Sequence, residues 1–153
     1  MNLRAYPPYA GRLERLFAYL IDTVLLALPG ALLVSLLKEN PITILGVFFI
    51  SLAYYTHFTA SPWQATPGKR LLGLYVIRTD RRRLTTRDAA ERFLAFILPS
   101  LPIYTSFIPA NQSPILVFWL TIFWFSPILF TPERVGMHDR LCATRVVVGK
   151  ADA

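Results

Sequence analysis

Residues 12–28 read Arg12-Leu-Glu-Arg15-Leu-Phe-Ala-Tyr-Leu-Ile-Asp22-Thr-Val-Leu-Leu-Ala-Leu28, and this stretch decides the fold. From Leu16 to Leu37 almost every side chain is apolar or small. A helix of that length is long enough to cross ~30 Å of hydrocarbon. The stretch therefore predicts a first membrane span over residues 16–37.

Asp22 is the one acidic residue within this apolar run. Because a helix rises about 1.5 Å per residue, Asp22 would lie ~9 Å inside the near end of the span. A carboxylate at that depth costs about 3 kcal/mol on insertion scales, so it should face protein and have a partner. Arg15 shares a helix face with Asp22 but lies two turns away, too far for an easy direct bond. Another part of the chain must therefore supply the partner.

The composition also indicates an integral membrane protein. Of the 153 residues, 54% are hydrophobic, and the mean hydropathy is +0.45. A soluble domain of this length would be less apolar. The 16 Lys and Arg residues exceed the 9 Asp and Glu residues, which gives a net charge of +7. These basic residues flank apolar runs, as cytoplasmic membrane loops require, so we expect contact with the lipid bilayer and no nucleic-acid partner.

The cysteine and histidine content argues against a metal site or a disulfide. The single cysteine, Cys142, excludes an intramolecular disulfide. His57 and His138 are far apart in the sequence, and neither has a second histidine at the spacing of metal ligands. We therefore expect no metal and no cofactor.

Three further apolar runs predict three more spans, over residues 42–60, 93–109 and 115–130. Three prolines predict that the middle one of these runs is bent or broken: Pro99, Pro102 and Pro109. Two short polar breaks should each join antiparallel helices, at 38–41 and 110–114. The expected fold is therefore an all-α membrane protein, a four-span helical bundle forming one domain over residues 1–153.

The remaining segments, loop 61–92 and tail 131–153, are polar and basic. Every basic residue except Lys38 lies before the first span, in this loop or in this tail. This distribution follows the positive-inside rule and predicts that the loop, the tail and both termini are cytoplasmic.

Local patterns predict a small cytoplasmic β element and two helix starts. Leu74–Thr79 alternates as a strand does, and we expect Val146–Val148 to pair with it. Thr66 and Pro67 are typical of a helix start, with Thr66 as the cap. Thr85-Thr-Arg-Asp88 is a plausible capping box for a second helix.

Four of these motifs follow one another along nearly the whole chain: Ala10-Gly11…Arg15-x-x-Ala18-x-x-x-Asp22, Thr66-Pro-Gly-Lys-Arg-Leu-Leu-Gly-Leu-x-Val76, Ala89-Ala-x-Arg92 and His138-Asp139-x-x-x-x-Thr144-x-Val-Val. This arrangement resembles the RDD family of membrane proteins, named for an arginine and two aspartates.

By position, the resemblance assigns the three naming residues to Arg15, Asp22 and Asp139, with Arg12 as the alternative arginine. It also assigns a loop motif to four consecutive residues: Thr66, Pro67, Gly68 and Lys69. The turn at Asp80-Arg81 departs from the family, because a glycine is usual there. We expect the chain in the plasma (inner) membrane of a bacterium.

Two functions remain open. The resemblance implies a family in which some members have been proposed as sodium/proton or related cation antiporters. A carrier needs an acid at membrane depth, and Asp22 is the only one deep in a span. The alternative is a non-catalytic scaffold or accessory subunit with a structural cluster of buried charges: Arg15, Asp22, Arg92 and Asp139. No arrangement typical of an enzyme stands out, so we expect no enzymatic activity.

Within this cluster, we expect Arg92 to be the direct partner of Asp22, because both lie near the cytoplasmic ends of spans. Asp139 would then balance the second arginine. No internal repeat is evident from the sequence alone, and four spans make a small bundle. A carrier would therefore need a homo-oligomer or a membrane partner protein to build its pathway.

Overall fold

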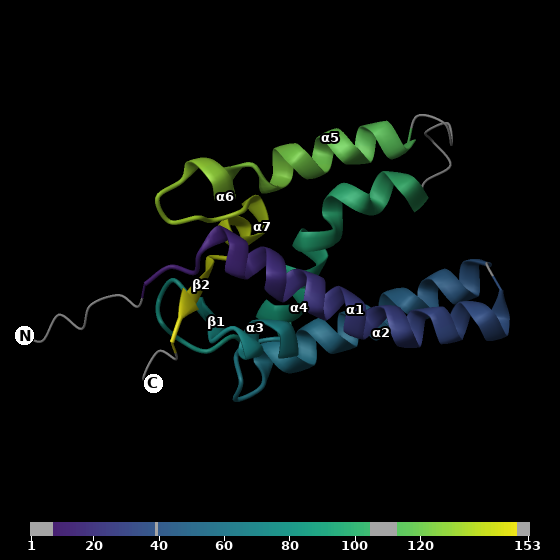
Figure 1. The fold of residues 1–153 in the computed structure, drawn as a ribbon, viewed down its shortest axis with the longest axis horizontal. Helices are drawn as coiled ribbons and strands as arrows, with labels where there is room; N and C mark the ends of the chain where they lie inside the picture. Colours follow the sequence, from purple (N-terminus) through teal and green to yellow (C-terminus); the bar gives the residue numbers. More distant parts are fainter. Residues whose placement is uncertain (1–7, 39, 105–112, 150–153) are drawn as a thin grey trace, which may run out of the picture.

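A computed structural model describes residues 8–38, 40–104 and 113–149. Two helical hairpins extend in the same direction from a small sheet (Figure 1). The elements in chain order are α1 (Arg12–Leu37), α2 (Pro41–Ala60), α3 (Pro67–Leu71), β1 (Leu74–Arg78), α4 (Thr86–Ile97), the 3-10 helix η1 (Leu98–Tyr104), α5 (Ser113–Phe125), α6 (Pro127–Phe130), α7 (Met137–Leu141) and β2 (Thr144–Val148).

The helices α1 and α2 coincide with the expected first and second spans, and both are long and apolar enough to cross a membrane. The side chain of Asn40 begins α2 by accepting hydrogen bonds from the backbone N–H groups of Ile42 (2.8 Å) and Thr43 (3.1 Å). Most apolar side chains on both helices point outward; Leu28 is 71% exposed and Ile42 is 73% exposed. Such an apolar outer surface is suited to lipid contact.

The second hairpin differs from the expectation of two regular spans. Its first helix, α4, begins well before Phe93 and passes at Leu98 into η1, which contains Pro99 and Pro102. Proline cannot donate the helical hydrogen bond, which accounts for the change of helix type. Residues 105–109, the end of the expected third span, lie outside the described residues. Among the residues described, only α1 and α2 have the length of a span, so a four-span bundle is not confirmed.

The expected β element is confirmed. Strands β1 and β2 pair antiparallel, with Leu74 opposite Val148 and Arg78 opposite Thr144. The sheet packs on the starts of α1 and α4 through a small core of buried residues: Ala10, Ala18, Leu74, Val76, Leu84, Ala89 and Val146. Each strand follows a five-residue helix, α3 or α7. We refer to α3, β1, α7 and β2 together as the platform.

Both expected helix starts are present, but they are capped differently. At α4 the capping box is complete: Thr85 Oγ1 accepts the Asp88 N–H (3.2 Å), and Asp88 Oδ2 accepts the Thr85 N–H (2.9 Å). At α3, Pro67 occupies the first position as expected, but the Thr66 side chain makes no capping bond. Its hydroxyl group is instead directed at Asp22. The turn after β1 places Arg81 in the left-handed region (φ 66°), a conformation that favours the glycine expected in this turn from the resemblance.

Candidate functional site

The carboxylate of Asp22 is fully buried and accepts three hydrogen bonds. Its Oδ1 accepts the Tyr54 hydroxyl and the Gly68 backbone N–H, both at 2.8 Å, and its Oδ2 accepts the Thr66 hydroxyl at 2.5 Å. Lys69 Nζ lies 4.0 Å from Oδ2 and donates to Thr66 Oγ1 at 3.3 Å. These contacts supply the partners that a carboxylate inside an apolar helix requires. We call these five residues the Asp22 cluster.

The Asp22 cluster depends on a close approach of α3 to α1. A Cβ atom on Gly68 would lie 2.3 Å from the carbonyl oxygen of Ala18 and 2.9 Å from the Asp22 carboxyl group. Only glycine leaves room for the backbone N–H to reach the carboxylate at this position. The buried Ala18, one turn before Asp22, keeps the facing side of α1 small. Gly68 of the loop motif thus has a direct steric role.

Lys69 carries its charge in a nearly enclosed position. Its side chain is 14% exposed, and its Nζ lies 5.7 Å from the centre of the Tyr55 ring. Burial lowers the pKa of Lys69 to about 8, and the charge of Arg92 acts in the same direction, against the opposing effect of Asp22. A base that can lose its proton near neutral pH therefore stands beside Asp22.

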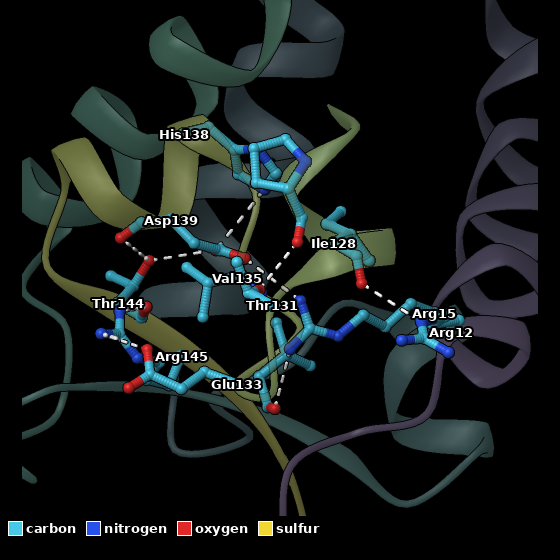
Figure 2. Close-up of polar contacts among 12 residues, drawn as sticks. Arg12, Arg15, Ile128, Thr131, Glu133, Val135, His138, Asp139, Thr144 and Arg145 are labelled. Atoms are coloured by element: carbon cyan, nitrogen blue, oxygen red, sulfur yellow. Dashed lines mark hydrogen bonds and ion pairs between the residues drawn. The ribbon is translucent and has the colours of Figure 1, made fainter. Parts of the chain in front are cut away.

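The second cluster is centred on Asp139 of α7, which is also fully buried (Figure 2). Arg92 of α4 donates to Asp139 Oδ1 through Nε (3.1 Å) and Nη2 (2.5 Å), and the Thr144 hydroxyl donates to the same oxygen (3.2 Å). Arg15 of α1 donates to Oδ2 through Nη1 (3.2 Å) and to the Val146 carbonyl through Nη2 (3.1 Å). Burial acts to raise the pKa of Asp139, but His138, Arg92 and Arg15 together hold it well below its usual range.

The prediction that Arg92 binds Asp22 is wrong. Arg92 binds Asp139 instead, because the planar guanidinium group meets both the Asp139 carboxylate and the Thr144 hydroxyl. Asp22 is satisfied by uncharged donors from α2, from Thr66 directly before α3 and from the Gly68 N–H of α3. The prediction that Asp139 balances an arginine is confirmed, and Asp139 binds both. The four expected cluster residues thus belong to two clusters rather than one.

Arg12, the alternative naming arginine, binds neither aspartate. Its side chain donates to the carbonyl oxygens of Ile128 (3.3 Å) and Leu129 (2.8 Å) (Figure 2). These bonds join the start of α1 to α6. Of the two candidate naming arginines, Arg15 is therefore the one that belongs to the Asp139 cluster.

His138, which is isolated from other histidines in the sequence, is a member of the Asp139 cluster. Its buried ring packs between Phe96 and Phe125, and its Nε2 lies 3.4 Å from Asp139 Oδ1. Burial lowers the pKa of His138 to about 4, although Asp139 acts in the opposite direction. The ring is therefore uncharged at neutral pH. Its position directly before Asp139 in the sequence was the one available signal.

We expect the protein to lose stability as the pH falls from 6.5 toward 4. In that range the unfolded chain binds a proton at His138 that the folded chain does not, which destabilises the fold by up to about 3 kcal/mol. Thermal unfolding in detergent across this range measures the effect. In His138→Gln the slope between pH 6.5 and 4.5 should be smaller. An unchanged slope in the variant would contradict this assignment.

An open pocket of about 390 Å³ lies apart from both aspartates, between α4 and the platform. It is lined by Arg78, Arg87, Asp88, Glu91, Leu141, Cys142 and Ala143. In the parts of the chain described here, no three His, Cys, Asp or Glu side chains are grouped to hold a metal. The two clusters contain paired charges, and within them Lys69 and His138 are the two bases whose pKa values burial lowers.

Comparison with known proteins supports the assignment made from the motifs. The sequence profile of the RDD family matches residues 9–143, which include both aspartates and the whole Asp22 cluster. The chain is 27% identical over 164 residues to the uncharacterized protein YxaI of Bacillus subtilis (strain 168), an alignment that covers 90% of this chain and 96% of that protein. No solved structure matches. The chain belongs to the RDD family of membrane proteins.

Proposed function

We propose that this protein is a non-catalytic membrane scaffold or accessory subunit, whose buried charges hold the platform on the membrane helices. The observation that carries the proposal is the convergence on Asp139. One carboxylate binds Arg15 from α1 and Arg92 from α4, and it joins both hairpins to α7. A buried charge that is fully paired in this way gives registry between elements rather than chemistry. The bilayer is one partner, and a second copy or another membrane protein is the other.

The proposal places the chain in the bacterial plasma membrane with four spans and cytoplasmic termini. The exposed apolar surfaces of α1 and α2 support two of the spans. The apolar segment Pro114–Phe130, which is shorter, supports a further crossing together with α4 and η1. All arginines of the platform then lie on the cytoplasmic side, in keeping with the positive-inside rule.

This topology makes a direct prediction for reporter fusions. Fusions at positions 39 and 112 should report an external location, and a fusion at position 150 should report the cytoplasm. The reason is that the two short breaks together hold one basic residue, Lys38, whereas the segments expected to be cytoplasmic hold all the others. A cytoplasmic signal at position 112, with an external signal at 39, would contradict the four-span arrangement.

A cation/proton carrier is the second candidate, and the Asp22 cluster favours it specifically. Lys69, with its pKa lowered to about 8, stands 4.0 Å from a carboxylate in an apolar helix. Loss of the lysine proton would leave the Asp22 carboxylate with only neutral donors, a state that attracts a cation. This reading requires a pathway to Asp22, which a second copy or a partner protein would complete.

Flux measurements in proteoliposomes distinguish the two candidates. The scaffold predicts that a pH-sensitive dye trapped inside reports no sodium- or potassium-driven proton movement above that of empty liposomes. Asp22→Asn is the matched control, since it removes the charge and keeps the shape. A flux that is present in the natural protein and absent in Asp22→Asn would overturn the scaffold in favour of the carrier.

A further inference from the structure

The segments that lead into the two strands match each other at one constant separation along the chain. Ser61-Pro-Trp-Gln-Ala-Thr-Pro-Gly-Lys-Arg-Leu71 precedes β1, and Thr131-Pro-Glu-Arg-Val-Gly-Met-His-Asp-Arg-Leu141 precedes β2. Proline, arginine and leucine recur at the same places, and a serine corresponds to a threonine. The match continues into the strands, where Val76 corresponds to Val146.

The backbone repeats in the same positions as the sequence. Two residues other than glycine adopt positive φ at matching places before the short helices, Gln64 at 50° and Arg134 at 52°. Their N–H groups donate to the matching carbonyls of Ser61 (2.9 Å) and Thr131 (3.0 Å). After the short helices, Gly73 (φ 66°) corresponds to Ala143 (φ 48°). Positive φ is uncommon outside glycine, so its recurrence at matching places is informative.

The register of the sheet has the symmetry that such a repeat requires. Val76 pairs with Val146, its own counterpart in the match. Exchanging the two strands converts the pair Leu74–Val148 into the pair Thr144–Arg78, which is also present. An approximate two-fold axis therefore passes between Val76 and Val146.

The helices before these segments correspond as well. Glu14-Arg-Leu-Phe-Ala-Tyr19 at the start of α1 matches Glu91-Arg-Phe-Leu-Ala-Phe96 in α4. α3 packs on α1, and α7 packs on α4. The helices α1 and α4 each begin one of the two hairpins that extend from the sheet in the same direction (Figure 1).

We infer that residues 14–78 and 91–148 are two copies of one unit, which consists of a helical hairpin, a short helix and a strand. The copies are fused through the turn after β1 and related by the axis at Val76 and Val146. A repeat that is not evident from the sequence alone is thus inferred once the backbone is compared. The repeat is hidden in the sequence because few residues are identical and the hairpins differ in length, which shifts the alignment between α4 and α7.

This duplication relates the two arginines that bind Asp139 to each other. Arg15 and Arg92 are equivalent residues, and Lys69 and Asp139 are equivalent residues of opposite charge. The arginines of both copies therefore converge on the acid of one copy, while the equivalent position in the other copy holds a base. The charges of Arg92 and Arg15 both lower the pKa of Lys69, which agrees with a position of Lys69 near the two arginines. By symmetry, an acid at position 69 would lie within reach of the same two arginines.

The experiment moves the acid from one copy to the other. Asp139→Asn should lower the melting temperature in detergent, and adding Lys69→Asp should restore more than half of the loss. Two arginines and two aspartates then balance in the buried region. Asp139→Asn with Arg70→Asp is the matched control, because it changes the charge equally at the neighbouring residue and should restore nothing. A double variant that folds but is no more stable than this control would overturn the inference.

If the double variant does not fold, a circular permutant decides. The duplication makes the link from β1 to α4 equivalent to a link from β2 to α1. The Val148 N–H donates to the Pro8 carbonyl at 2.9 Å, so the end of β2 lies beside the segment that leads into α1. A chain opened between Asp80 and Arg81, with its original ends joined, should insert into membranes and melt near the temperature of the natural chain. A permutant that fails to insert would overturn the inference.

Discussion

Asp139→Ala is expected to lower the free energy of unfolding by about 3–5 kcal/mol, because it leaves Arg15 and Arg92 buried without a counter-charge. The substitution also removes the carboxylate oxygen that accepts the Thr144 hydroxyl. Chemical or thermal unfolding of the purified protein in detergent measures the change. Insertion into the membrane should persist, since the apolar helices and not the platform determine it.

Asp80→Ala is the matched control for this variant. Asp80 also pairs with an arginine, Arg78, at 3.5 Å, but its side chain is 45% exposed. An exposed pair of this kind contributes about 0–1 kcal/mol. Equal losses in the two variants would contradict the claim that burial makes Asp139 decisive.

Gly68→Ala is expected to destabilise the protein by roughly 3 kcal/mol through overpacking. The new methyl group would meet the Ala18 carbonyl oxygen at 2.3 Å, and a backbone atom in a helix cannot move aside easily. Relief of the contact would push α3 away from α1 and break the hydrogen bond from the Gly68 N–H to Asp22. The expected result is a lower melting temperature in detergent.

Gly30→Ala provides the comparison, since Gly30 lies inside α1 and its added methyl group would meet nothing closer than a Val47 methyl at 4.0 Å. Alanine favours a helix over glycine by about 1 kcal/mol, so this variant should be neutral or slightly more stable. Gly68→Ala with the stability of Gly30→Ala would show that α3 does not rest on α1 as described.

Features set by local sequence could be predicted, and features set by contacts between distant elements could not. The capping box at Thr85 follows from residues close together in the chain, and so do the two strand segments, each of which shows a strand-like pattern within its own sequence. The break at Pro99 was also predictable, because proline acts on its own helix. The donors to Asp22 could not be predicted, since Tyr54 and the Gly68 N–H come from elements distant in the chain. Whether Arg92 binds Asp22 or Asp139 likewise depends on the fold and could not be read from the sequence.

The repeat shows the same limit in another form. Its strongest signals are the positive φ values at Gln64 and Arg134 and the register at Val76, none of which is visible in side-chain chemistry. Residues of different size and charge, such as Gly68 and His138, occupy equivalent places. A backbone comparison was therefore needed to relate Lys69 to Asp139.

The central claim, that the buried charges are structural, is tested most directly by the thermal unfolding of Arg15→Met/Arg92→Met/Asp139→Leu. Replacing a buried charge cluster by apolar residues of similar size is often neutral or stabilising, whereas removing one partner is not. The triple variant should therefore regain most of the stability that Asp139→Ala loses. A triple variant that melts no higher than Asp139→Ala would contradict the claim.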